Sequence, residues 1–148
     1  MIKYIACDAT KPIGEGNKII VHVCNDSGGF GKGFVLSLTK RWDKPKKVYN
    51  KYYKQKELNL GDIQIVKVED DIIVINMIAQ KGYINPNNKV PLQYSALEKC
   101  FLKVKEYAMI TKSSIHGPKF GSGLSGGDWS KIELMINNPL VKFKSLYI

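Results

Sequence analysis

The sequence predicts an α/β protein, a three-layer α/β/α sandwich in which helices cover both faces of a central β-sheet. Segments rich in β-branched residues, typical of strands, alternate along the chain with segments whose apolar residues recur at helical spacing. Neither a repeat nor a linker divides the 148 residues, and this length is sufficient for one self-contained hydrophobic core. We therefore expect a single domain that spans residues 1–148.

The first half of the chain predicts two strands followed by two helices. Residues 3–7 form a short strand-like segment, and residues 19–24 are a β-branched run that ends at a glycine cluster. Apolar residues recur at helical spacing over residues 33–42, and Pro45 lies in the segment that ends that helix. A second helix is expected at residues 46–55.

The second half of the chain continues the alternation. Two β-branched runs separated by an acidic turn predict two strands, and a long segment with helical apolar spacing predicts a helix. A short strand, a helix and a final strand complete the chain. In order, these elements are expected at residues 63–68, 72–78, 92–109, 113–116, 129–136 and 141–148.

The composition excludes several classes of protein. Hydrophobic residues make up 44% of the chain and charged residues 24%, which is typical of globular proteins and not of disordered or collagen-like ones. No apolar run reaches the about 20 residues that span a bilayer, and the N-terminus lacks the pattern of a secretory signal. The three cysteines (Cys7, Cys24 and Cys100) have the spacing of neither a disulfide framework nor a zinc site. We expect a soluble cytoplasmic monomer with no membrane contact, metal or other cofactor.

The net charge of +10 raises the hypothesis of a nucleic-acid partner. Eight basic residues lie within residues 40–56, where Asp43 is the only acidic residue. Such a segment could attract polyphosphate or nucleic acid, but a solvated helical face in a lysine-rich chain explains it too. Arg41 is the only arginine, which disfavours base-specific recognition, so charge alone does not decide the function.

Two glycine-rich loops carry the strongest functional signal. Residues 27–33 and 121–127 each follow an expected strand and precede an expected helix. In open α/β sheets, ligands bind outside the carboxyl ends of the strands, where glycines permit positive φ and let backbone N–H groups approach an anion. Gly123 is expected to combine positive φ with close approach of the ligand. Two such loops in equivalent places predict a cradle for a diphosphate.

Three segments resemble the macrodomain family, the ADP-ribose-binding α/β/α module with a mixed central sheet. They are residues 4–10 (YIACDAT), residues 22–34 with the motifs HVCND and GKGF, and residues 118–129 (PKFGSGLSGGDW). The resemblance is greatest to small stand-alone macrodomains, which include ADP-ribose-1''-phosphate phosphatases and terminal ADP-ribose–glutamate glycohydrolases. The motif that begins at His22 resembles the phosphatase type, and the Gly-x-Gly-Leu motif resembles both types.

The resemblance implies a set of ligand contacts. Asp8 would accept a hydrogen bond from the adenine amino group, although an aspartate here can equally cap a turn. Tyr147 would pack beside adenine, or it belongs to the core with its hydroxyl at the surface. The implied ligand-binding residues are Asp8, Ala9, Asn25, Phe30, Gly31, Lys32, Gly33, Gly121, Ser122, Gly123, Leu124 and Tyr147.

The resemblance also indicates which reaction is disfavoured. The glutamate-directed glycohydrolases use a lysine and an aspartate at positions that Gln80 and Ser125 occupy in this chain. Lys81 is one residue further along, and on a strand that single step points its side chain to the opposite face. Glutamine and serine replace neither a nucleophilic amine nor a general base.

Two residues are the catalytic candidates, and each has a structural alternative. His22 is an acid/base candidate because its ordinary pKa lies near neutral pH, but its position on a strand also suits a buried histidine. His116, before the second loop, is the other histidine. Asp128 could supply a carboxylate, or it is the N-cap of the helix that follows.

These observations predict a protein that binds ADP-ribose and hydrolyses ADP-ribose 1''-phosphate to ADP-ribose and phosphate. Two alternatives remain. One is removal of ADP-ribose from acidic side chains or from nucleic acid, and the other is an ADP-ribose reader without turnover. The expected partners are accordingly ADP-ribose or its 1''-phosphate and, for the first alternative, an ADP-ribosylated protein or nucleic acid.

Overall fold

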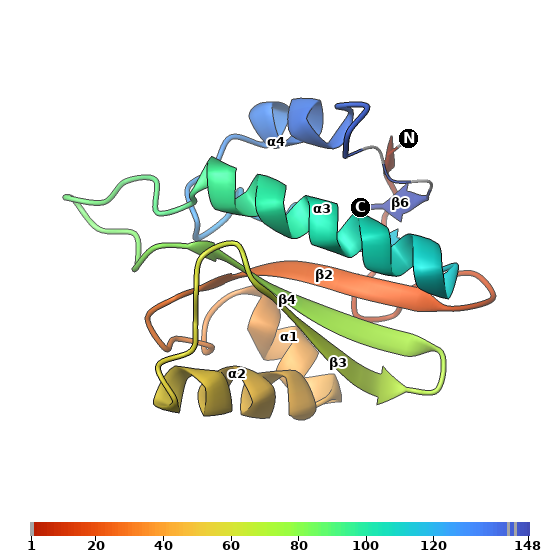
Figure 1. Ribbon diagram of the computed structural model, residues 1–148, viewed down its shortest axis with the longest axis horizontal. Helices are drawn as coiled ribbons and strands as arrows, with labels where there is room; N and C mark the ends of the chain where they lie inside the picture. Colours follow the sequence, from red (N-terminus) through yellow and green to blue (C-terminus); the bar gives the residue numbers. More distant parts are fainter. Residues whose placement is uncertain (1, 142, 144) are drawn as a thin grey trace.

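A computed structural model describes residues 2–141, 143 and 145–148 and confirms the three-layer α/β/α sandwich (Figure 1). Six strands form one sheet in the order β1-β6-β5-β2-β4-β3. All neighbouring pairs are parallel except β3 and β4, so the sheet is mixed as expected. The strands are β1 (Ile2–Lys3), β2 (Lys18–Asn25), β3 (Ile63–Glu69), β4 (Ile72–Gln80), β5 (Ser114–His116) and β6 (Leu146–Tyr147).

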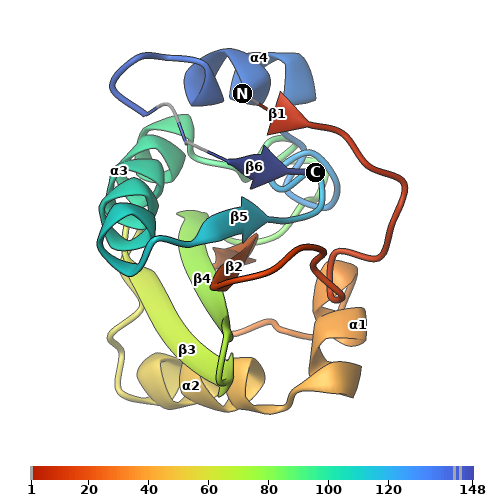
Figure 2. The ribbon, with the colours of Figure 1, turned by 90° about the vertical axis from the view of Figure 1, so that its right-hand side faces the viewer.

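Two helices cover each face of the sheet (Figures 1 and 2). Helices α1 (Phe34–Arg41) and α2 (Lys44–Lys54) lie on one face, and α3 (Tyr94–Thr111) and α4 (Trp129–Ile136) lie on the other. Strand β2 serves both cores, because alternate side chains of a strand point to opposite faces. Ile19 and Val21 pack toward α3 and α4, whereas Ile20 and Cys24 pack toward α1 and α2.

The interior elements agree with the sequence-based prediction, and the two edge elements do not. Strand β1 covers two residues instead of residues 3–7, because its only partner, β6, is itself two residues long. The final strand, expected at 141–148, is confined to Leu146–Tyr147, and residues 142 and 144 of that prediction lie outside the described residues. Pro45 lies in the first turn of α2, where its missing N–H costs nothing.

The parallel central strands set the position of the two glycine-rich loops. Strand β2 pairs in parallel with both β4 and β5, so the carboxyl ends of these three strands meet at one edge of the sheet. Residues 26–33 follow β2 and residues 117–128 follow β5, which brings the two loops together at that edge. Within the described part of the chain, none of the helices is both long and apolar enough to cross a membrane.

Candidate functional site

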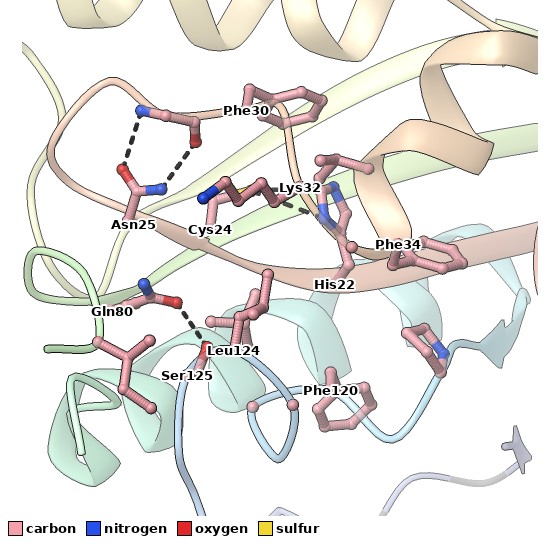
Figure 3. A pocket seen from close by; sticks show the side chains of 18 of the residues that line it. His22, Cys24, Asn25, Phe30, Lys32, Phe34, Gln80, Phe120, Leu124 and Ser125 are labelled. Atoms are coloured by element: carbon pink, nitrogen blue, oxygen red, sulfur yellow. Dashed lines mark hydrogen bonds between the residues drawn. The ribbon is translucent and has the colours of Figure 1, made fainter. Parts of the chain in front are cut away.

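A cavity of about 740 Å³ lies between the two glycine-rich loops (Figure 3). The carboxyl half of β2, from His22 to Asn25, forms one part of its wall. The first loop contributes residues 29–33, and the second contributes residues 118–121 and 123–125. Its volume lies within the range of small-molecule sites. We call it the first cavity.

A second cavity of about 650 Å³ adjoins the first. It is lined by residues 4–9 and by residues 116–119, with Tyr147 from β6. The two cavities share Phe34, Pro118 and Lys119, so together they form one trough with a junction at these residues. A trough of this form suits an elongated ligand with two bulky ends.

The trough includes all but one of the predicted ligand-binding residues. Asp8, Ala9 and Tyr147 line the second cavity. The first cavity is lined by Asn25, Phe30, Gly31, Lys32, Gly33, Gly121, Gly123 and Leu124. Ser122 is the exception, because it lines neither cavity and its hydroxyl donates to the carbonyl oxygen of Lys119. These placements bring the residues together, and their contacts with a ligand stay a prediction.

The side chain of Asn25 organises the first loop. Its Oδ1 accepts hydrogen bonds from the N–H groups of Ser27 and Gly29 at 2.8 and 3.2 Å, and its Nδ2 donates to the Gly29 carbonyl at 2.7 Å (Figure 3). The buried hydroxyl of Tyr49, from α2, donates to the same side chain at 2.7 Å. The loop is therefore held in shape by the strand it leaves and by the helix beneath it.

The glycines of the two loops have different roles. A Cβ atom at Gly28 would collide with the ring of Tyr53, and one at Gly29 would collide with the ring of Tyr83. These two glycines allow the loop to pack between tyrosines. Gly31 and Gly123 instead face open space, since a Cβ atom at either position would have no neighbour within 4 Å. They are the two points where a ligand can approach bare backbone.

The expectation of positive φ at Gly123 is wrong. In the second loop, the left-handed conformation occurs at Gly121 and Gly126. Both glycines are also tightly packed, because a Cβ at Gly126 would collide with the carbonyl oxygen of Lys89 and one at Gly121 would crowd Leu92. Gly123 therefore contributes space, not an unusual backbone conformation.

His22 is buried at the base of the first cavity and is held by a polar network. Its Nε2 lies 2.6 Å from Oδ1 of Asn76, whose amide nitrogen donates to Gln64 and to the Pro45 carbonyl. Because that amide oxygen can only accept, Nε2 of His22 carries the proton and Nδ1 does not. The Nδ1 atom lies 3.7 Å from the Cys24 thiol. Burial lowers the pKa of His22 to about 4, so the ring is neutral at pH 7.

Asp128 is the N-cap of α4. Its carboxylate accepts a hydrogen bond from the N–H of Ser130 at 2.9 Å, which is the structural role that the sequence offers as the alternative to catalysis. Asp128 lines neither cavity. The two catalytic candidates are thus separated, because only His22 borders the trough, and a catalytic role for either residue stays a prediction.

Tyr147 and His116 form a stacked pair beside the second cavity. Their ring centroids are 4.8 Å apart with an angle of 11° between the planes, and the ammonium of Lys3 lies 5.6 Å from the Tyr147 centroid. The ring faces of Tyr147 already have neighbours. An adenine beside Tyr147 would meet the edge of this ring unless Lys3 moves.

Gln80 and Ser125 form a buried, uncharged pair in the wall of the first cavity. The Ser125 hydroxyl donates to Oε1 of Gln80 at 2.6 Å (Figure 3). The Gln80 amide donates to the Gly82 carbonyl at 2.8 Å. Lys81 is exposed and does not line the cavity; it lies one residue beyond the end of β4, so strand alternation does not set its direction. No group of three or more His, Cys, Asp or Glu side chains that could hold a metal ion occurs among the described residues.

Sequence reasoning assigned no ligand role to several residues that line the trough, among them Lys119, Phe34, Tyr83 and Ile84. Lys119 belongs to a motif whose residues have no individual signal in the sequence, and Phe34 is indicated only as part of the apolar face of a helix. Tyr83 and Ile84 lie in the long loop after β4, and only the tertiary fold brings this loop to the first cavity. The hydroxyl of Tyr83 donates to the Ser27 carbonyl at 3.2 Å.

The free energy of unfolding is expected to fall as the pH drops from about 6.5 to about 4. Burial holds the pKa values of His22 and His116 at about 4, below the ordinary 6.5, so the unfolded chain takes up protons in this window that the folded chain does not. For His22 alone the loss is on the order of 1 kcal/mol per pH unit. Urea denaturation across this pH range measures it. A His22→Gln variant should show a shallower dependence, and an unchanged one would contradict the argument.

No family model matches the chain, but solved structures do. A protein of unknown function from Bacteroides thetaiotaomicron superposes with a TM-score of 0.92 at 42% identity, over 99% of this chain and 96% of that one. A macrodomain protein from Streptomyces coelicolor gives 0.84 at 36% identity, over 100% and 99%. The Oceanobacillus iheyensis macrodomain with ADP gives 0.70 at 21% identity, over 99% and 80%, which shows the fold alone.

The curated relatives differ in how much of their own length this chain spans. Mouse Chromodomain-helicase-DNA-binding protein 1-like is 29% identical over 149 residues, and this chain spans 16% of its length. An ADP-ribose 1''-phosphate phosphatase from Candida albicans is 27% identical over 154 residues, which covers 99% of this chain and 96% of that protein.

Proposed function

Because the chain belongs to the macrodomain family, we propose that residues 1–148 form one macrodomain that binds ADP-ribose in the trough and hydrolyses ADP-ribose 1''-phosphate. The single observation that carries the proposal is the trough formed by the two adjoining cavities, in whose first cavity bare backbone at Gly31 and Gly123 faces open space. Adenosine would occupy the second cavity, the diphosphate would cross the junction, and the distal ribose would enter the first cavity.

The charges along the trough support a ligand with several phosphates. Among the described residues that line the first cavity, Lys32 and Lys119 are the charged side chains, and none is acidic. Lys119 also lines the second cavity, so it lies at the junction where the diphosphate would cross. Backbone N–H groups of both loops add hydrogen-bond donors that neutralise phosphate oxygens without carrying a charge themselves.

The proposed reaction is hydrolysis of the phosphate ester at the distal ribose. Water attacks phosphorus, the bond between phosphorus and the ribose oxygen breaks, and that oxygen takes a proton to give ADP-ribose and inorganic phosphate. Two groups can accept the proton of the attacking water, namely Nδ1 of His22 and an oxygen of the substrate's own phosphate. Asp128 is a less favourable acceptor, since its carboxylate caps α4 outside both cavities.

The Gln80–Ser125 pair supports phosphate release over removal of ADP-ribose from glutamate. Neither residue can supply an amine nucleophile or a carboxylate base, and their mutual hydrogen bond at 2.6 Å leaves the cavity wall uncharged. The curated ADP-ribose 1''-phosphate phosphatase that matches nearly the full chain supports the same choice.

A reader without turnover is the second candidate. It is favoured by the absence of carboxylates from the described lining of the first cavity and by the low pKa of His22, a weak base at about 4. Calorimetry with ADP-ribose in the presence of a chelator, followed by measurement of phosphate released from ADP-ribose 1''-phosphate, tests both. We expect micromolar binding and measurable release. Absence of binding would refute both candidates, and binding without phosphate release would support the reader without turnover.

An Asp8→Asn variant is expected to bind ADP-ribose about 1–3 kcal/mol more weakly, with little change in thermal stability. Oδ1 of Asp8 accepts hydrogen bonds from the N–H and hydroxyl of Thr10 at 2.9 and 2.8 Å, so this carboxylate shapes a turn and its Oδ2 is left for adenine. Asparagine keeps the turn acceptor but presents an N–H₂ donor to the adenine amino group. Calorimetry measures the change.

The control for this prediction is the ligand. Inosine diphosphate ribose lacks the adenine amino group, so it should bind the parent protein more weakly than ADP-ribose. Equal affinity of the parent protein for the two ligands would mean that Asp8 serves only the turn with Thr10.

A further inference from the structure

The positive charge of this protein is concentrated in one short segment. Residues 40–56 contain eight basic residues and one acidic residue, so seven of the ten net positive charges lie in this segment. The remainder of the chain carries a net charge of only +3. The concentration therefore does not reflect a uniformly lysine-rich chain, and none of it is used by the proposed binding of ADP-ribose.

The fold places this charge on the end of α1 and along α2. We call the exposed basic residues and tyrosines of this segment the basic face; they are Lys40, Arg41, Lys44, Lys47, Lys51, Tyr52, Tyr53, Lys54 and Lys56, and the acidic Asp43 is exposed among them. Two of its cations have acidic partners, since Lys47 lies 3.2 Å from Asp43 and Arg41 lies 3.6 Å from Glu69. Lys51 and Lys54 form no ion pair with the described residues. Most of this charge thus faces solvent without compensation.

Two exposed tyrosines lie between Lys51 and Lys54 in the sequence. Tyr52 and Tyr53 keep 39% and 46% of their surface accessible, on the last turns of α2. The ring of Tyr53 lies against Gly28 of the first glycine-rich loop. The basic face is therefore continuous with the rim of the first cavity, and α2 lies on the opposite side of the sheet from α3 and α4 (Figure 1).

The helix that carries this face is firmly anchored. Pro45 and Tyr49 are buried, and the Tyr49 hydroxyl donates to the backbone carbonyl of Asn25 at 2.8 Å. Because the backbone of α2 is already fixed, binding a partner does not require this segment to fold, which favours association.

We propose that the basic face binds a single strand of nucleic acid. Lysines supply mobile point charges for a phosphate backbone, and exposed aromatic rings supply surfaces on which unpaired bases stack. A duplex hides its base faces, and an acidic peptide has none, so neither would use Tyr52 and Tyr53. With a single arginine in the segment, we expect binding without base-specific recognition. This binding requires no ADP-ribose, and the proposal is independent of the proposed function.

The test is fluorescence anisotropy of a labelled oligothymidylate, longer than the about 16 nucleotides of a large single-strand site, with the full chain. A Lys51→Glu/Lys54→Glu variant is expected to bind at least about tenfold more weakly. For this variant, the slope of log affinity against log salt concentration should be shallower by roughly 0.7 for each phosphate that is no longer neutralised. The matched control is Lys112→Glu/Lys131→Glu, which makes the same charge change at the end of α3 and on α4 and should bind like the parent.

A second variant distinguishes a strand from any other polyanion. Tyr52→Leu should weaken oligothymidylate binding by about tenfold and leave heparin, which has no bases, unaffected. Equal effects of the two double variants would overturn the proposal, as would oligothymidylate binding that Tyr52→Leu does not change. Calorimetry with ADP-ribose, expected to be unchanged in Lys51→Glu/Lys54→Glu, verifies that the variant is folded.

Discussion

A Gly123→Val variant is expected to lose at least about 100-fold in affinity for ADP-ribose, which corresponds to about 2.7 kcal/mol, while its thermal stability stays close to that of the parent. A Cβ at this position meets nothing within 4 Å in the free protein, so we expect the fold to tolerate the substitution. It instead fills space in the first cavity, where the ligand would approach the backbone. Calorimetry and thermal unfolding on the same sample separate the two effects.

Gly127→Val is the matched control within the same loop. A Cβ at Gly127 would collide with the carbonyl oxygen of Gly121 and with Leu92, so this variant should lose stability first and affinity only as a consequence. Gly31→Val, at the equivalent open position of the first loop, should behave like Gly123→Val. A folded Gly123→Val variant with full affinity would show that the second loop is only a turn.

The sequence predicts the interior of the fold better than its edges. Strand β2 follows from a β-branched run, because a strand covered by helices on both faces is buried along its length. Helix α3 follows from a long apolar pattern of helical period, because one of its faces packs against the sheet. Strands β1 and β6 are two residues long, and two paired residues leave no period to detect. Their extent is set by each other, across more than 140 residues of chain.

The candidate site, too, could be predicted from the sequence only in part. The two glycine-rich loops are visible in the sequence because a glycine cluster directly after a strand marks a turn or a close approach to the backbone. Which glycines face open space is not visible in the sequence, since the tyrosines that pack against Gly28 and Gly29, and leave Gly31 free, are brought there by the fold. Likewise the burial of His22 follows from Phe30 and Phe34 packing on its ring, and the sequence does not contain that contact as a pattern.

Phosphate release from ADP-ribose 1''-phosphate is expected to be measurable, whereas release of ADP-ribose from a glutamate-modified protein is expected to be weak or absent. The positions of the glycohydrolase lysine and aspartate hold Gln80 and Ser125, so no covalent lysine intermediate should be trapped by borohydride. Both substrates are assayed with the same enzyme preparation. Robust glutamate-linked hydrolysis that survives Lys81→Ala would overturn this choice of reaction.

Variants of the two catalytic candidates identify the proton acceptor in this reaction. His22→Gln keeps a hydrogen-bond donor for Asn76 and removes the ring base. If His22 is the base, this variant should lower kcat by about 10²–10⁴-fold. If the substrate's own phosphate is the base, kcat should be nearly unchanged. Asp128→Ser keeps the N-cap of α4 and removes the carboxylate, so it should retain full activity; a comparable loss in this variant would assign the role to Asp128.

The pH profile of the parent protein is an independent check. With a pKa of about 4, a catalytic His22 is already deprotonated at pH 6, so kcat/KM should show no inflection near 6.5 and should fall only as the pH drops through about 4.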